Sequence, residues 1–365
     1  MELIAEIASR VSDAADERAA RYAYRRSFNQ LRPQLAMYPA GSRPSEVFEQ
    51  AAQTVRALGA TCLPLAIAVA MHLYPFCVLE CVPIPLSSIA RLKRALLLRT
   101  IRNRSLILAN TGSERSNGST TPLIARKAAD GVRIDGRCEY LSLSSVADIV
   151  LFKAQLADSN HAVLCAADLR ASSVRIGPWK FTGEMELSDT SPVTFVDHRV
   201  PDGHYLIVPD DAGLGCISNY QRAWFHLFIA EIYLARVDHL RSTWGLPDQG
   251  ADRSELARLR QQSLQLLDGF QVGGDVAPLT RMTATLKLRV SKMSQTTAAA
   301  LRSRGLAAQA GGLGYIKSQP TADRKILSTL SAVNSHPSSA ASSPRLRRPA
   351  SEPRPAADPA GASCA

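Results

Sequence analysis

The sequence is poor in aromatic residues, which make up 6% of 365 residues, although its net charge is +11. Proteins that bind single-stranded nucleic acid stack the bases on aromatic side chains beside basic ones. The two densest basic stretches, residues 91–104 and 345–349, contain no aromatic residue. The composition therefore argues against nucleic acid as a partner. It favours an anionic small molecule, such as a CoA thioester or a dinucleotide, which the same charge attracts.

Motifs for metals, membranes and common hydrolases are also missing. The seven cysteines form no Cys-x-x-Cys pair, and the histidines have no common spacing for a metal triad, so no metal site is expected. The sequence has no P-loop, GxSxG or HExxH stretch, and no basic-then-apolar stretch opens it, so no signal peptide is expected. The longest apolar run, residues 62–86, is interrupted by four prolines, a histidine and a glutamate. We expect a core helix over residues 64–74, no membrane span and a cytoplasmic protein.

Residues 1–104 have the periodicity of helices. A helix over residues 2–26 is predicted, and its apolar face is formed by Ile4, Ile7, Val11 and Ala15. A second helix is predicted to begin at Pro44 and to end at Gly59. This part is expected to form an N-terminal α-helical domain.

Residues 105–210 change to a period of two, which is typical of strands. The stretch "VRIDGRCEYLSLSS" alternates around Asp135 and Gly136, a pair that favours a hairpin turn. Turn residues recur every eight to twelve positions, as in small antiparallel sheets. We expect a central antiparallel β-barrel domain.

Helical periodicity returns over residues 211–331, which we expect to form a C-terminal four-helix bundle. The stretch "YQRAWFHLFIAEIYLARVDHLRS" is apolar nearly all round and predicts a buried central helix. Residues 332–365 are rich in Ser, Pro, Ala and Arg, and predict a disordered tail. The expected fold class is α+β, with a β-domain inserted between two helical halves.

Four stretches occur in an order that resembles the acyl-CoA dehydrogenase family. They are "LANTGSERSNG" (108–118), "IDGRCEYLSLSSVADIVLF" (134–152), "RIGPWKFTGEMELSDTSPVTFVDHRVP" (175–201) and "AGGLGYIKSQPTADR" (310–324). The resemblance covers roughly residues 45–330. It implies an FAD-dependent oxidoreductase that dehydrogenates an acyl thioester, carried by CoA or by an acyl carrier protein. It also implies a homodimer or homotetramer.

The resemblance also implies a set of FAD contacts. Tyr140 and Ser142 match the aromatic residue and the hydroxyl residue at the flavin. Asn110, in place of the family's usual Thr, is expected to donate to the flavin together with the backbone of Thr111 and Gly112. Gly311 and Gly312 match a glycine pair that meets the FAD of a neighbouring subunit.

Two residues are implied at the substrate. Ser116 matches the family's serine beside the acyl-CoA chain, and Arg222 matches an arginine beside the active site. A buried arginine needs a charged partner. That partner is either the substrate or a carboxylate on the same helix, Glu231 or Asp238.

A catalytic carboxylate is missing from both places where the family keeps it. One place falls near Asn334 and Ser335, and the other is occupied by Gln221. Abstraction of an α-proton needs such a base. Glu231, near Arg222, is one substitute. The alternatives are a two-component flavin-dependent monooxygenase supplied by a partner reductase, and a non-catalytic partner or scaffold.

Overall fold

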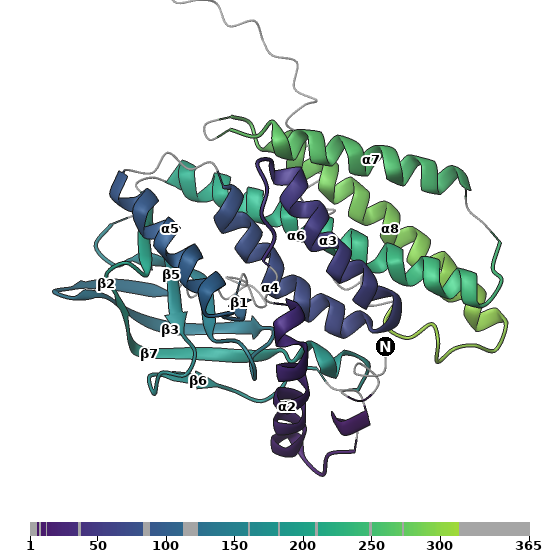
Figure 1. The fold of residues 1–365 in the computed structure, drawn as a ribbon, viewed down its shortest axis with the longest axis horizontal. Coiled ribbons are helices and arrows are strands. Elements are labelled where there is room, and N and C mark those ends of the chain that lie inside the picture. Colours follow the sequence, from purple (N-terminus) through teal and green to yellow (C-terminus); the bar gives the residue numbers. More distant parts are fainter. Residues whose placement is uncertain are drawn as a thin grey trace, which may run out of the picture.

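A computed structural model describes residues 6, 9–11, 13–35, 38–82, 88–111, 123–159, 161–181, 183–208, 211–247, 250–271 and 274–313. Along the chain, helices come before and after the strands of a central sheet (Figure 1). The order of helices, strands and helices agrees with the α+β prediction. The tail at 332–365 lies outside these residues.

The N-terminal helical stretch is divided where the apolar pattern predicted one helix. Residues 6 and 9–11 are helical, residues 13–16 are not, and the long helix α2 covers Glu17–Leu35. Asp16 accepts a 2.8 Å hydrogen bond from the backbone N–H of Ala19, which satisfies a free donor of the first turn. This cap starts a new helix at residue 17, so the single predicted helix over 2–26 was wrong.

The apolar run forms helix α4 (Leu63–Cys81), which passes through Pro75 instead of ending there. In length and composition α4 would qualify as a membrane span, yet 72% of its most apolar window is buried inside the protein. It is enclosed by α3 (Pro44–Thr61) and α5 (Ser88–Asn103) together with the sheet (Figure 1). It is therefore a core helix, as predicted.

The central strands form one open, mixed sheet instead of the predicted antiparallel barrel. Its order is β6-β7-β3-β2-β4-β5-β8, with β1 beside β4. The two outermost strands of this path do not pair with each other in the described structure, and β1–β4 and β2–β4 are parallel. The strands are β1 (Leu108–Asn110), β2 (Ile124–Ala128), β3 (Gly131–Leu141), β4 (Ile149–Leu156), β5 (Ala162–Asp168), β6 (Val174–Ile176), β7 (Ser191–Pro201) and β8 (Tyr205–Val208).

The predicted hairpin turn at Asp135 and Gly136 is a bulge inside β3. The chain reverses instead between Ala128 and Gly131, which are paired across β2 and β3. At Gly136 (φ +131°) the register of β3 against β7 shifts. Asp135 accepts a 2.8 Å hydrogen bond from the backbone N–H of Asp197 on β7. The Asp-Gly pair therefore serves the β7 pairing and not a turn.

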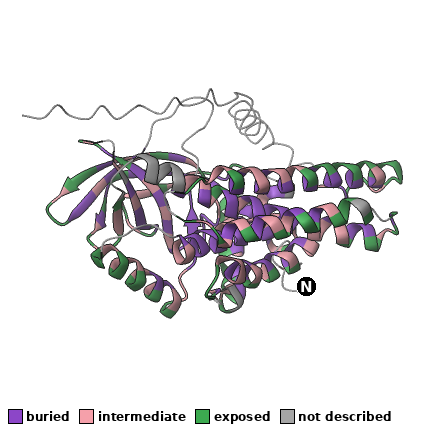
Figure 2. Ribbon diagram, turned by 90° about the horizontal axis from the view of Figure 1, so that it is seen from above, coloured by how far each residue is buried: buried purple, intermediate pink, exposed green. Residues whose placement is uncertain are grey.

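The C-terminal part consists of α6 (Asp211–Thr243), α7 (Gly250–Asp268) and α8 (Ala277–Ser303). A fourth helix of the predicted bundle would follow residue 313, outside the described chain. On the N-terminal side α3 packs against α6, where Phe48 contacts Trp224 and Phe228 with ring centroids 5.9 and 5.2 Å apart. The buried residues follow these inner helix faces and one face of the sheet (Figure 2).

Candidate functional site

A mainly apolar cavity of about 70 Å³ lies between the sheet and the helices α4, α5 and α6. Pro75 and Val78 of α4, Leu151 of β4 and Leu206 of β8 contribute apolar walls. Its polar residues are Asn110, Gln221, Lys93, Arg94, Lys153 and His204. The cavity therefore combines an apolar interior with amide and cationic groups, as small-molecule sites do, although its volume is below the range of about 300–1,000 Å³ that is usual for them.

Asn110 and Gln221 meet at the hydroxyl of Tyr74. The side-chain amide of Asn110 donates to the Tyr74 oxygen, and the Gln221 side chain is hydrogen-bonded to the same hydroxyl. Burial raises the pKa of Tyr74 to about 12, and these two hydrogen bonds oppose the rise. The cluster is therefore neutral at physiological pH. It can donate and accept hydrogen bonds but cannot act as a strong base.

Thr111 carries a buried hydroxyl that has no hydrogen-bond partner among the described residues. Its backbone N–H donates to the Leu151 carbonyl oxygen at 3.3 Å. A buried hydroxyl without a partner costs free energy, so this hydroxyl is suited to a partner outside the described residues. The residues that follow, including the predicted contacts Gly112 and Ser116, lie outside the described structure.

Tyr140 and Ser142 lie at the end of β3. The Tyr140 side chain is 41% exposed and stacks on Phe181, with ring centroids 6.3 Å apart. The ammonium of Lys180 lies 5.3 Å from the centre of the Tyr140 ring. The Ser142 hydroxyl is 3.0 Å from the Thr190 hydroxyl, which also contacts the Ser188 hydroxyl at 2.9 Å. An aromatic surface and an oriented hydroxyl are therefore both present, and neither residue lines the cavity beside Asn110.

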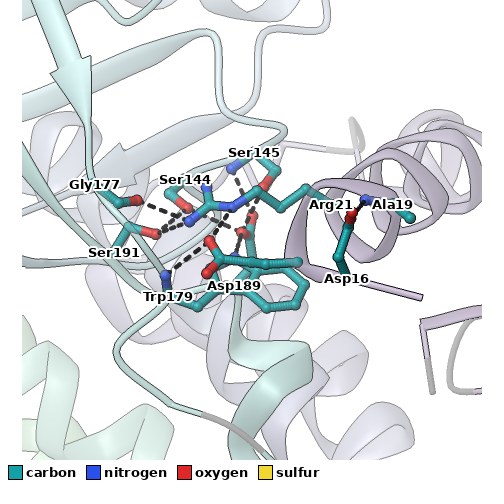
Figure 3. Close-up of polar contacts among 10 residues, drawn as sticks. Asp16, Ala19, Arg21, Ser144, Ser145, Gly177, Trp179, Asp189 and Ser191 are labelled. Carbon is teal, nitrogen blue, oxygen red and sulfur yellow. Dashed lines mark hydrogen bonds and ion pairs between the residues drawn. The ribbon is translucent and has the colours of Figure 1, made fainter. Parts of the chain in front are cut away.

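The turn after Ser142 is held by the fully buried carboxylate of Asp189 (Figure 3). This carboxylate accepts hydrogen bonds from the Ser144 hydroxyl (2.9 Å), from the Ser145 N–H and hydroxyl (both 2.7 Å) and from the Trp179 indole N–H (2.7 Å). Burial raises the pKa of Asp189, although these hydrogen bonds oppose the rise. Three of these four donors belong to the turn that carries Ser142, so Asp189 holds this turn in place.

Arg222 and Glu231 lie in different environments and do not pair with each other: the arginine is exposed and the glutamate is buried. Arg222 is exposed, against our expectation of a buried arginine, and its guanidinium donates to Asn219 at 3.3 Å. Glu231 is 4% exposed and forms ion pairs with Arg260 and, at 3.3 Å, with Arg56. Asp238 pairs with Arg253 at 2.7 Å. Neither carboxylate is the predicted partner of Arg222, because α3 and α7 supply other arginines to them.

Gly311 and Gly312 lie in the turns after α8, next to the beginning of α4. Gly312 has φ +75°, and a Cβ atom there would approach the Leu63 side chain to 3.0 Å. A glycine is therefore required by the backbone and by packing. The predicted contact with the FAD of another subunit remains a prediction.

Sequence reasoning missed three residues of this region. Tyr74 was read only as part of an apolar run, and Lys153 and His204 were not singled out. Lys153 donates a 2.6 Å hydrogen bond to Ser218 and lines the cavity beside Gln221. The available signal was a tyrosine and a lysine inside otherwise apolar elements. In addition, no cluster of three or more His, Cys, Asp or Glu side chains suited to a metal ion occurs in the described ranges.

Neither a protein-family model nor a curated protein matches this chain. Solved structures do match. PigA with FAD and proline has a TM-score of 0.66 at 14% identity, over 91% of this chain and 98% of PigA. FkbI, for biosynthesis of a methoxymalonyl extender unit, has a TM-score of 0.63 at 15% identity, over 90% and 96%. FMN-bound TdsC from Paenibacillus sp. A11-2 has a TM-score of 0.60 at 18% identity, over 92% and 96%. The chain therefore has the acyl-CoA dehydrogenase fold, as the order of motifs in its sequence predicts.

Proposed function

We propose that this protein is a flavin-dependent oxidoreductase, and that it uses reduced flavin and oxygen on a small organic substrate. The observation that carries the choice of reaction is the chemistry of the cavity beside Asn110. Among its lining residues that the structure describes, none is Asp or Glu. Removal of an α-proton needs a base, whereas an oxygen-dependent reaction does not require one at this place.

Groups suited to a flavin lie at two places, beside the cavity and at the end of β3. The hydroxyl of Thr111, which has no partner among the described residues, and the amide of Asn110 are hydrogen-bonding groups suited to the carbonyl edge of a flavin. The half-exposed Tyr140 ring offers an aromatic surface, and Ser142 offers a hydroxyl. A bound flavin would supply two-electron redox chemistry. FAD is the cofactor that the sequence resemblance implies, and FMN, present in the TdsC structure, is the second to test.

The chain's own residues would bind and orient the substrate. Lys93, Arg94 and Lys153 give the cavity a positive charge, which favours a substrate with an anionic or carbonyl group. Gln221, whose side chain is hydrogen-bonded to the Tyr74 hydroxyl, would hydrogen-bond that group, and the apolar walls would exclude water from it. An acyl thioester of CoA or of a carrier protein fits this description. A flavin reductase is the partner that this reaction needs.

Dehydrogenation of an acyl thioester is the second candidate, and it is favoured by the overall likeness to PigA, whose structure contains FAD. It would need a carboxylate in the cavity. The Glu231 carboxylate forms ion pairs with two arginines, and Arg222 is exposed beside Asn219. A catalytic role for either therefore has less support than the oxygen-dependent reaction.

The decisive experiment adds FAD or FMN to the purified protein and follows flavin absorbance. Bound flavin that is bleached anaerobically by an acyl thioester would contradict the oxygen-dependent proposal and support dehydrogenation. Turnover only in the presence of a flavin reductase and oxygen would support the oxygen-dependent proposal. If neither flavin binds at micromolar concentration, both reactions are excluded and a scaffold role remains.

Two serines that contact the same threonine provide a matched pair of variants. Ser142→Ala removes the hydroxyl proposed for the flavin, and Ser188→Ala removes the other hydroxyl bonded to Thr190. We expect Ser142→Ala to weaken flavin binding or slow its reduction by about tenfold. Ser188→Ala should leave both unchanged. Equal behaviour of the two variants would remove Ser142 from the flavin site.

A further inference from the structure

A second cavity, of about 460 Å³, lies between α2 and the sheet, on the other side of the turn that follows Ser142. Arg25, Asn29 and Arg32 of α2 line it from one side. Residues 144–147, together with Arg170, line it from the other. Its volume falls in the range of about 300–1,000 Å³ that is usual for small-molecule sites.

Of the three arginines in this cavity, two share one carboxylate. Arg32 pairs with Asp148 at 3.0 Å, and Arg170 pairs with the other oxygen of the same side chain. Arg25 has no carboxylate partner among the described residues and donates to the Ser145 carbonyl oxygen at 2.9 Å. Each guanidinium has five N–H donors, so donors remain on all three. The cavity therefore carries an excess of positive charge and of hydrogen-bond donors.

The basic surface continues along α2. An adjoining hollow of about 590 Å³ shares Arg25 with the first cavity and adds Arg18 and Arg21. Arg21 pairs with Glu17 at 2.8 Å and reaches across to Ser191 and the Gly177 carbonyl oxygen (Figure 3). Residues 18, 21, 25, 29 and 32 are spaced by three or four, so they share one face of the helix. Four of these five residues are arginines, and Glu17 lies beside them in the adjoining hollow, so this face is mainly basic.

We propose that the 460 Å³ cavity binds the phosphate or pyrophosphate group of a small-molecule ligand. The planar guanidinium fork matches phosphate oxygens and forms short, charge-assisted hydrogen bonds with them. Asn29 is exposed, lines the cavity and adds an amide donor. Val146, Leu169 and Ile176 add an apolar wall that suits the remainder of the ligand. The proposal does not rest on the flavin assignment.

Anchoring of α2 to the sheet does not account for all of this charge. A helix can be anchored through one backbone carbonyl oxygen per arginine, as Arg25 and Ser145 show. Arg170 lies outside α2, has a side chain that is 69% exposed, and still points to Asp148 at the cavity. Its convergence with Arg25 and Arg32 adds charge repulsion that a phosphate would relieve.

The test is titration calorimetry of the full-length protein with pyrophosphate and with AMP at low ionic strength. We expect saturable binding that weakens at least tenfold in Arg170→Gln, which loses an exposed cation of the cavity. Arg26→Gln is the matched control, because Arg26 is exposed on α2 and does not line the cavity. Asn29→Leu reduces the space without a change of charge and should abolish AMP binding.

The outcomes distinguish a specific phosphate site in the cavity from non-specific attraction of anions to a basic protein. Binding that does not saturate, or that weakens equally in Arg26→Gln and Arg170→Gln, would overturn the proposal. Thermal melts of each variant report whether it is folded. Two sources of the phosphate are distinguished by two further comparisons. FMN binding that exceeds riboflavin binding, with the difference lost in Arg170→Gln, identifies the tail of a flavin. AMP that binds without competing with FMN identifies a separate nucleotide.

Discussion

The indole N–H of Trp179 donates a 2.7 Å hydrogen bond to the buried carboxylate of Asp189. This contact joins the segment before the short 3₁₀ helix η1 (Gly183–Ser188) to the beginning of β7. Because Asp189 also binds Ser144 and Ser145, the turn after Ser142 depends on it. The candidate flavin contact is thus held in place by a residue that does not itself face the candidate cavity.

Replacement of Asp189 by Ala should therefore destabilise the fold strongly. It removes the shared acceptor of four buried donors, of which the Ser144 hydroxyl also contacts the Ser191 hydroxyl, and Asp189 has φ +47°, a conformation that alanine adopts poorly. We expect the free energy of unfolding to fall by about 3 kcal/mol or more. Urea unfolding followed by circular dichroism measures it. Asp189→Asn tolerates the same backbone angle and should lose less; a loss below about 0.5 kcal/mol in Asp189→Ala would refute the role.

The variant Thr111→Val should affect the stability of the protein and its affinity for flavin differently. Valine has nearly the shape of threonine but no hydroxyl, so it removes a buried polar atom that has no partner in the described structure. We expect the flavin-free variant to be as stable as the original protein, or more stable by about 1 kcal/mol. Its affinity for flavin should nevertheless fall, by about five- to tenfold.

Thermal melts without flavin and fluorescence titration with flavin measure the two effects of Thr111→Val. A variant that is less stable and binds flavin normally would show that the hydroxyl serves the fold.

The sequence predicted correctly those features that depend on neighbouring residues in the chain, such as the start of a helix. The helix that was expected to begin at Pro44 does so, because a proline suits a first helical position. The Asp135–Gly136 pair could not be assigned in this way, since the same dipeptide suits a hairpin turn and a bulge. Its pairing with β7, some sixty residues later, decides between them. Likewise, the sheet is mixed because β1 and β2 pair in parallel with β4, and alternation along a strand gives no signal for the direction of its partner.

The candidate site was predictable only in part for the same reason. Asn110 was singled out by its position in a motif, and it lines the candidate cavity, while its contact with a flavin stays a prediction. Its contact with Tyr74 joins α4 to β1, and no spacing in the sequence reveals such a contact. The arginines that pair with Glu231 come from α3 and α7, which are distant from it in the sequence. The sequence alone therefore could not distinguish a glutamate in a structural ion pair from a catalytic glutamate.

Glu231→Gln should cost stability without a direct effect on flavin chemistry. The carboxylate is almost fully buried between Arg56 and Arg260, and its neutralisation leaves Arg260 with Glu49 as its remaining carboxylate. We expect a loss of about 2–4 kcal/mol in unfolding free energy. Asp238→Asn, on the same helix, breaks an exposed pair with Arg253 and should cost less than about 1 kcal/mol.

Urea unfolding and the rate of flavin reduction are to be measured side by side for Glu231→Gln and Asp238→Asn. Lost flavin reduction at unchanged stability would instead assign Glu231 as the base.

Alkaline pH should weaken the protein through Tyr74. Burial raises the pKa of Tyr74 from 10 to about 12, so the folded state holds this proton more tightly than the unfolded chain. Its contribution is complete below pH 10, declines as the pH rises, and is lost above pH 12, the value of the folded pKa. A shift of this size corresponds to about 2–3 kcal/mol.

Tyr24, Tyr38 and Tyr220 are shifted in the same direction, so the whole protein loses stability over this range by the sum of several groups. Tyr74→Phe removes one of them. Its unfolding free energy should therefore fall less steeply between pH 10 and 12 than that of the original protein. Urea unfolding at a series of pH values measures the two slopes. Equal slopes would mean that Tyr74 ionises in the folded protein as readily as in water, and that the cluster with Asn110 and Gln221 is open to solvent.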